Sequence, residues 1–164
     1  MNKQGIVYLL LVVAIALQVS AISTDHWSCH KDTGITMHIG LWKMCMDVPG
    51  GTKCSHAPPE GVDAKGFPKN SLYAVRAFAI LGVLLVAFSL VCAAYLKGNN
   101  KCQVMCLVGG AVCSIIANII WAAELLKFGG STNDAIKADP GYSFYLNLSG
   151  GLVALLAAGY QYSA

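Results

Sequence analysis

Residues 74–96 read AVRAFAILGVLLVAFSLVCAAYL, an apolar stretch whose only charged residue is Arg76, near its start. About 20 helical residues, at a rise of about 1.5 Å each, cross a hydrocarbon core of about 30 Å, so this stretch is long enough to span a bilayer. Three further apolar stretches of similar length lie at Gly5–Ile22, Val104–Leu126 and Phe144–Tyr160. The four together cover about half of the chain, which predicts a small polytopic membrane protein that is mainly α-helical.

The composition agrees with a membrane location. Hydrophobic residues make up 56% and charged residues 12% of the 164 residues, whereas a typical soluble domain is about 25% charged. We therefore predict a single tetraspan domain over residues 1–164, without room for a soluble enzyme. Its expected segments are membrane spans at 5–23, 74–96, 103–126 and 143–161, an extracellular loop at 24–73, a cytoplasmic turn at 97–102 and a second extracellular loop at 127–142.

Lysines outside the spans predict the orientation. Lys3, Lys97 and Lys101 have no acidic neighbours outside the membrane, whereas the acidic and basic residues of the loop Ser23–Tyr73 balance to zero. Short loops rich in lysine stay cytoplasmic, so both termini and the short turn are expected in the cytoplasm. Lys3, the first apolar run and 19–21 also resemble a secretory signal peptide. The run of about 18 residues is longer than a usual signal and favours a retained helix.

Small residues recur at helical spacing in the last two spans. Gly150, Ala154 and Ala158 lie on one face of the fourth span, and Gly110 and Ser114 lie on one face of the third. Such patterns let helix backbones approach closely in lipid. They either close the bundle within the chain or form a contact between two copies.

Three polar residues lie within or at the ends of the spans: Arg76, Asn118 and Glu124. A charge at mid-membrane costs at least a few kcal/mol, but much less near an interface. By the predicted orientation Arg76 and Glu124 share the outer side, where they are expected to pair with each other or to cap loop carbonyls. Asn118 lies deeper in the span, and a single asparagine does not indicate a permeation path.

The outer loop holds three of the seven cysteines, namely Cys29, Cys45 and Cys54. The outer side of a membrane is oxidising, so Cys45 and Cys54 are interpreted as a disulfide that closes a short loop. Between them, Pro49-Gly50-Gly51 favours a tight reversal and predicts a β-hairpin clamped at its base. Cys29 is then either a free buried thiol or part of an intermolecular bridge.

Two other kinds of cysteine chemistry were considered. Cys102 and Cys106 lie near the cytoplasmic membrane surface, where cysteines are candidates for palmitoylation, although they are equally well explained as small apolar helix residues. Zinc-type ligands also gather in the outer loop: His26, Cys29, His30, His38, Cys45, Cys54 and His56. Their spacings match no compact zinc module, so no metal site is predicted.

One glycosylation sequon is present at Asn147-Leu148-Ser149. It lies at the start of the fourth span, where the glycosylation machinery would not reach it. We expect it to be unmodified.

The outer loop also carries a recognisable order of residues: Trp27, then Gly40-Leu41-Trp42, then Cys45 and Cys54. This order resembles the W…GLW…C…C signature of the claudin, epithelial membrane protein and peripheral myelin protein superfamily. Arg76, at the start of the second span, resembles an arginine that follows the second cysteine in that family. The resemblance covers essentially the whole chain.

The resemblance implies a claudin-like fold, in which a small extracellular antiparallel β-sheet lies on a left-handed four-helix bundle and is joined by an extension from the second loop. By position, Cys45 and Cys54 would form the disulfide, Trp42 would pack at the boundary of sheet and membrane, and Arg76 would anchor the loop above it by hydrogen bonds. Trp27 and Gly40 are closer together than in typical claudins, so the first hairpin should be shorter.

No catalytic constellation stands out, so we expect no enzymatic activity, no cofactor and no nucleic-acid partner. The leading interpretation is a structural tetraspan of the plasma membrane or a cell junction. Its partners would be the lipid bilayer and other membrane proteins or copies of itself. The contacts, in cis or in trans, would be made by the extracellular loops, through Thr33–Met46 and Ser131–Tyr142.

Two alternatives remain open from the sequence. Some members of the superfamily are auxiliary subunits of a channel, receptor or larger membrane complex. Many claudins are paracellular pore formers, which need charged residues after the second cysteine. Here Glu60, Asp63, Lys65 and Lys69 alternate in sign, so the sequence indicates no ion selectivity.

Overall fold

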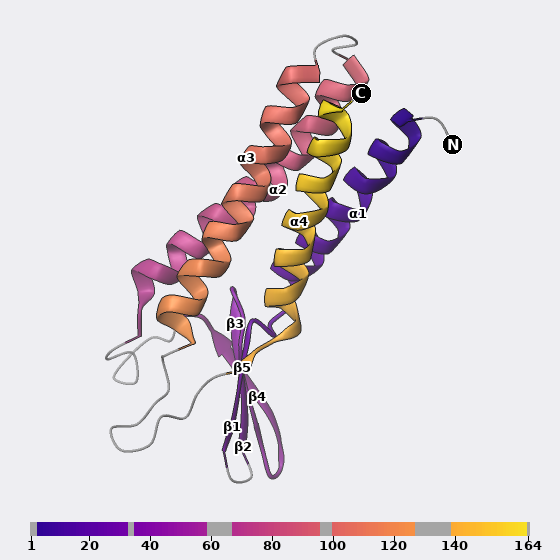
Figure 1. Cartoon of the computed structure of the whole chain (residues 1–164). Helices are drawn as coiled ribbons and strands as arrows, with labels where there is room; N and C mark the ends of the chain where they lie inside the picture. The colour runs from indigo at the N-terminus through magenta and orange to yellow at the C-terminus, as the bar shows by residue number, and fades with distance from the viewer. Residues whose placement is uncertain (1–2, 33–34, 59–66, 96–99, 127–138, 164) are drawn as a thin grey trace.

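Four long helices form a bundle, and a small sheet lies at one end of it (Figure 1). The computed structural model describes residues 3–32, 35–58, 67–95, 100–126 and 139–163. The helices are α1 (Lys3–Ser23), α2 (Lys69–Tyr95), α3 (Asn100–Ile120) and α4 (Tyr142–Tyr162), and α3 continues into a single π-helical turn, η2 (Trp121–Leu125). The strands are β1 (Ser28–Asp32), β2 (Ile35–Ile39), β3 (Lys43–Val48), β4 (Gly51–His56) and β5 (Asp139–Pro140). The predicted four-helix bundle with a small antiparallel sheet is confirmed.

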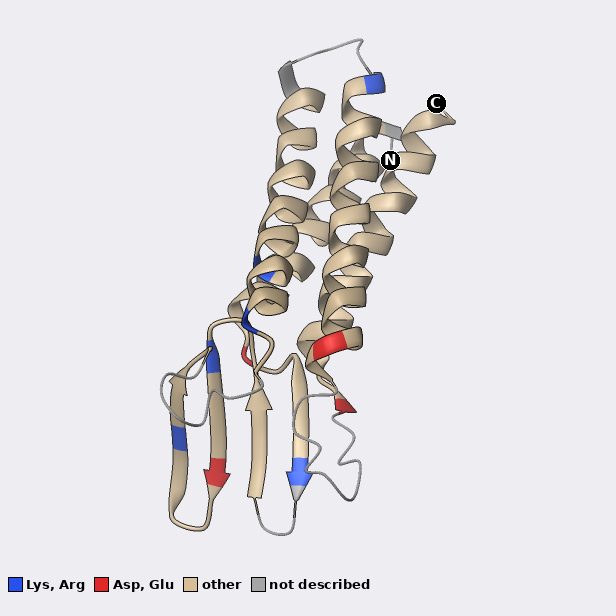
Figure 2. Cartoon of the chain, turned by 90° about the vertical axis from the view of Figure 1, so that its left-hand side faces the viewer, with Lys and Arg blue, Asp and Glu red and all other residues tan. Residues whose placement is uncertain are grey.

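All four helices are long and apolar enough to cross a membrane. The ribbon segments of charged residues lie on the sheet and towards the two ends of the helices (Figure 2). The helix α2 begins at Lys69, whereas its apolar stretch begins at residue 74. Hydropathy predicts which residues can lie in the hydrocarbon core, and it does not predict where a helix begins. Pro68, directly before Lys69, is compatible with a helix start. The first turn of α2 therefore extends beyond the apolar stretch towards the sheet.

Each helix packs along at least one other helix of the bundle. α2 lies along α3, α1 lies along α4, and α4 also packs on α3. Glycines allow close approach at these contacts: a Cβ on Gly110 would lie 2.9 Å from the Gly82 carbonyl oxygen, and one on Gly150 would lie 2.6 Å from Gln18 Cγ. At Gly110 and Gly150, the predicted small-residue pattern therefore closes the bundle within one chain.

A buried polar cluster joins three of the helices. Gln18 Nε2 of α1 donates to Ser114 Oγ of α3 at 2.8 Å. Asn147 Nδ2 of α4 lies 3.2 Å from both the Ser114 carbonyl oxygen and Asn118 Oδ1. The sequence had singled out Asn118 alone as a deep polar residue. Because Asn147 is fully buried in α4, its sequon cannot carry a glycan in the folded chain.

The sheet is antiparallel throughout, with the strand order β4-β3-β2-β1-β5. β5 precedes α4, so a segment between the last two helices completes the sheet that the first loop builds. The turn between β3 and β4 contains Gly50, and both Gly50 and Gly51 have positive φ angles, of 120° and 135°. Side chains rarely tolerate this backbone conformation, which explains two consecutive glycines at the reversal.

Apolar residues are buried in two clusters along the bundle. The cluster at the sheet end includes Trp27, Ile39, Leu41 and Trp121, so it joins strands and helices. The second cluster contains residues of the four helices only, Leu11 and Leu107 among them. The sheet is therefore packed into the bundle by an apolar core of its own.

Candidate functional site at the junction of sheet and helices

Trp27 packs the start of β1 against the helices. Its side chain is fully buried, and its ring centroid lies 5.0 Å from that of Trp121. The indole nitrogen donates to the Ala21 carbonyl oxygen of α1 at 2.8 Å. A buried tryptophan needs such an acceptor for its N–H group, and the freed carbonyl at the end of α1 supplies it. Trp27 thus fixes where the chain leaves α1 and enters the sheet.

Gly40 lies where β2 passes against the segment after α1. A Cβ on Gly40 would lie 2.3 Å from Asp25 Cα, a distance that no side chain can occupy. Leu41, the next residue, is fully buried in the core at the sheet end. The glycine therefore permits a close backbone approach, and the leucine holds it by apolar packing.

Trp42 is placed differently from Trp27, because 41% of its surface is exposed. Its indole nitrogen donates to the Ile22 carbonyl oxygen at 2.9 Å, and the Arg76 guanidinium lies 4.8 Å from its ring centroid. An amphipathic ring that is half exposed beside the end of a membrane-length helix suits the interface between lipid and water. The position at the boundary of sheet and membrane, which the resemblance implied for Trp42, stays a prediction.

Arg76 links α2 to two segments of the loop. Its Nε and Nη2 donate to the Leu41 carbonyl oxygen at 2.8 and 2.5 Å, and Nη2 also donates to the Ala57 carbonyl oxygen. Of the two roles considered for Arg76, capping of carbonyls is the one observed. In the described part of the chain no ion pair joins it to Glu124, whose side chain is exposed. Arg76 thus ties the turn after β2 and the segment after β4 to α2 by hydrogen bonds.

A disulfide joins Cys45 to Cys54, as predicted, with their Cα atoms 4.1 Å apart. The two residues lie directly opposite each other on β3 and β4, so the bond clamps the hairpin. Asp25 Oδ2 lies 3.5 Å from Cys45 Sγ, which is a contact and not a hydrogen bond because a disulfide sulfur carries no proton. Cys29 is half-buried on β1 and has a free thiol.

These contacts define a junction in which a clamped sheet is held on four membrane-length helices. The model of the PMP-22/EMP/MP20/Claudin family matches residues 4–159 of the chain. The chain belongs to this family. It is therefore an integral tetraspan membrane protein of a structural, non-enzymatic family. A comparison with curated proteins found no matching sequence.

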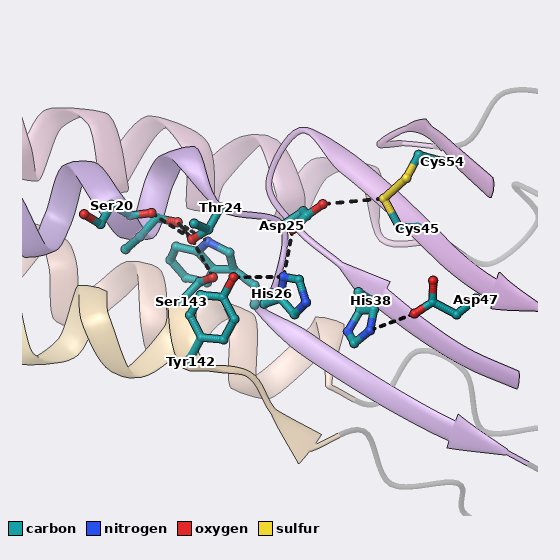
Figure 3. Close-up of polar contacts among 12 residues, drawn as sticks. Ser20, Thr24, Asp25, His26, His38, Cys45, Asp47, Cys54, Tyr142 and Ser143 are labelled. Carbon is teal, nitrogen blue, oxygen red and sulfur yellow. Dashed lines mark hydrogen bonds and ion pairs between the residues drawn. A yellow bond between two sulfur atoms is a disulfide. The ribbon is translucent and has the colours of Figure 1, made fainter. Parts of the chain in front are cut away.

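In this claudin-family chain, two histidines connect the junction to α4 (Figure 3). His26 Nδ1 lies 2.8 Å from Asp25 Oδ1 and 3.1 Å from the Tyr142 hydroxyl, with the two rings stacked at 4.7 Å. The His38 ring lies 4.3 Å from that of His26, and its Nε2 is 3.4 Å from Asp47 Oδ2. In the sequence these histidines were scattered candidate ligands. His26 precedes β1 and His38 lies on β2, and the backbone bond from Trp27 to Ile39 beside them holds the two segments together.

His30 is the buried histidine of the sheet. Burial lowers the pKa of His30, and the nearby Asp139 carboxylate of β5 partly opposes this shift. Its Nε2 has no hydrogen-bond partner among the described residues. A neutral imidazole is therefore favoured between β1 and the short strand β5.

The two cysteines proposed for palmitoylation lie at the other end of the family fold. Cys102 and Cys106 are half-buried on the first two turns of α3, away from the sheet. Both face Cys92 of α2, a residue that the sequence interpretation had not connected with them. In the described ranges, this is the one group of potential ligands close enough to share a metal ion.

Proposed function

We propose that this protein is a structural tetraspan of the plasma membrane or a cell junction, whose sheet lies outside the cell and contacts other proteins or further copies of the chain. The disulfide between Cys45 and Cys54 supports an oxidising location for the sheet. Lys101, at the opposite end of the bundle, supports a cytoplasmic location for that end. Membership of the claudin family supports the same arrangement.

The sheet topology favours a particular surface for these contacts. Among the described residues, β2 and β3 have a strand along both sides, β1 pairs with β5 only at Ser28 and Cys29, and β4 and β5 are the two edges. Backbone pairing with a partner is therefore possible at the edges and impossible at β2, which belongs to the predicted contact segment 33–46. Residues 33–34 and 131–138 of the predicted contact segments lie outside the described residues.

The observation that carries the proposal is the exposure of β4. All six of its residues are exposed, and the disulfide holds the strand in place. β5 is only two residues long. Long exposed edges are the places where strands from other chains add to a sheet. We therefore assign the contact to β4 rather than to β5.

Site-directed photocrosslinking tests this assignment in intact membranes. A photoreactive residue at Thr52 of β4 should give crosslinks to a partner or to a second copy. The matched control carries the same group at Leu156, which is 65% exposed on α4 and faces lipid by the proposed topology. Crosslinks at Leu156 without crosslinks at Thr52 would show that contacts are made between helices, and would overturn the proposal.

The two alternatives predict other results in the same cells. An auxiliary subunit would be recovered in a fixed ratio with one large partner. A paracellular pore former would change the electrical resistance and the dilution potential of a cell layer. Of the residues that would line such a pore, Glu60, Asp63 and Lys65 lie outside the described residues, and Lys69 is the first residue of α2. The structure therefore favours neither alternative.

A further inference from the structure

Three thiols converge at the end of the α2–α3 hairpin that is remote from the sheet. Cys92 lies in the last turn of α2, Cys102 in the first turn of α3, and Cys106 one turn further. Their Sγ atoms all lie within 4.8 Å of one another, and those of Cys92 and Cys102 are 3.3 Å apart. We call these three residues the trithiol cluster.

Helix geometry explains the convergence. Cys102 and Cys106 are four residues apart, which places them on one face of α3. α2 packs along α3, and this brings Cys92 opposite that face. The cluster is thus formed by side chains on two regular helices, which position donors more precisely than loops do.

The spacing of the thiols fits a shared metal ion. A zinc–sulfur bond is about 2.3 Å long, so two sulfurs bound to one ion are about 3.8–4.0 Å apart. That separation lies between the 3.3 Å of the closest pair and the 4.8 Å that bounds all three. Small side-chain rotations would bring the three sulfurs to bonding positions.

We propose that the trithiol cluster binds one thiophilic metal ion, Cu(I) or Zn(II). Sulfur donors select these soft or borderline ions over magnesium and calcium. Three donors satisfy three-coordinate Cu(I), whereas Zn(II) completes its tetrahedron with a water molecule. Each thiol that binds loses its proton to solvent as its metal–sulfur bond forms, without any change of oxidation state.

The burial of the cluster supports this assignment. Cys92 is only 2% exposed, whereas Cys102 and Cys106 are half-buried. The cluster is therefore partly accessible at Cys102 and Cys106, whereas Cys92 is covered. A reducing cytoplasm, which the proposed orientation implies for this end, would keep the thiols free.

Metal competition on the purified full-length chain in mild detergent tests the proposal. Cu(I) is added without oxygen against a coloured Cu(I) chelator, and Zn(II) is titrated separately against a coloured zinc chelator. We expect one ion per chain, and binding that tightens as the pH rises because protons are released. Replacing Cys92, Cys102 or Cys106 by Ser should each weaken binding by at least about tenfold.

Two other cysteines provide matched controls. Cys113→Ser changes a buried thiol of α3 outside the cluster, and Cys29→Ser changes a thiol of the sheet; neither should alter metal affinity. X-ray absorption of the metal-loaded wild-type chain should count three sulfur neighbours, and this measurement needs no variant to fold.

Three results would overturn the metal site. The first is an affinity that is equal in the wild type and in the triple Ser variant of the cluster. The second is a loss of affinity in Cys113→Ser that is as large as in Cys102→Ser. The third is full occupation of Cys102 and Cys106 by fatty thioesters in the native chain, which would leave one thiol. None of these results bears on contacts made by β4.

Discussion

The two ends of the bundle are held together in different ways. At the sheet end, directional bonds join segments far apart in the sequence, for example from Arg76 to the carbonyl oxygens of Leu41 and Ala57. At the opposite end, the buried contacts between helices are mainly apolar, among residues such as Leu11 and Leu107. Directional bonds demand one arrangement, whereas apolar packing tolerates several residues of similar volume. Substitutions should therefore be far more harmful at the sheet end.

The largest expected effect is that of Arg76→Ala. This change removes three donated hydrogen bonds and leaves two loop carbonyls without their partner. Bonds to charged groups contribute about 1.5–3 kcal/mol. Two of the three bonds share the Leu41 carbonyl oxygen and all three are only part-buried, so we expect a net loss of about 3 kcal/mol. Thermal unfolding in detergent, followed by circular dichroism, measures it.

Arg76→Lys is the matched control for that experiment. It keeps the charge but cannot reproduce the planar fork of the guanidinium, so its melting temperature should lie between those of the wild type and Arg76→Ala. Equal melting temperatures for Arg76→Ala and the wild type would show that the junction does not depend on these bonds.

Loss of the disulfide should be the next largest effect. In the chain-entropy model, a bridge over this short loop stabilises by about 2–3 kcal/mol. The double variant Cys45→Ser/Cys54→Ser should open the β3–β4 hairpin and leave the helices intact. Limited trypsin digestion would then cut after Lys53 while the helical circular dichroism is unchanged. If the helical circular dichroism also decreased in the double variant, that result would contradict a local role for the disulfide.

Two glycine substitutions compare the ends directly. Gly40→Ala places a methyl group on the backbone of Asp25, and we expect a loss of about 2 kcal/mol. Gly159→Ala lies near the opposite end of α4, where nothing is within 4 Å of the new Cβ, so its effect should stay within about 0.5 kcal/mol. Melting temperatures of both variants test the comparison, and a larger loss for Gly159→Ala would reverse it.

The smallest expected effect is on pH dependence. Because burial lowers the pKa of His30 in the folded chain, the unfolded chain takes up a proton first as the pH falls below about 6.5. Stability should therefore fall with acidification through that range. His30→Gln should flatten the dependence of melting temperature on pH between 7.5 and 5. Identical slopes for variant and wild type would show that His30 does not contribute.

Hydropathy alone was enough to predict the helices, because an apolar stretch of membrane length has few other folds available. The β3–β4 hairpin was predicted from the cysteine pair and the turn Pro49-Gly50-Gly51. The rest of the sheet was predicted only through the family resemblance, since a strand of five residues such as β2 shows no clear alternation. The participation of β5 also came from the resemblance, because a strand of two residues gives no signal of its own.

Contacts across helices could not be predicted. Gln18 and Asn147 each look like a single polar residue in an apolar run, and only the packing of three helices brings them to Ser114. Cys102 and Cys106 were singled out only for their place near the cytoplasmic membrane surface. Their third partner, Cys92, was missed because its proximity depends on the rotation of α2 against α3.

The buried polar cluster has a consequence for biosynthesis. The amide of Gln18 belongs to the first helix to be made, whereas its partner Ser114 lies in the third helix, and Gly150, against which its side chain packs, lies in the fourth. Until those helices arrive, the amide is exposed to lipid without a partner, which is unfavourable. Nascent chains should therefore stay with the insertion machinery until translation is nearly complete, and truncation before α4 should leave a product that cellular quality control removes.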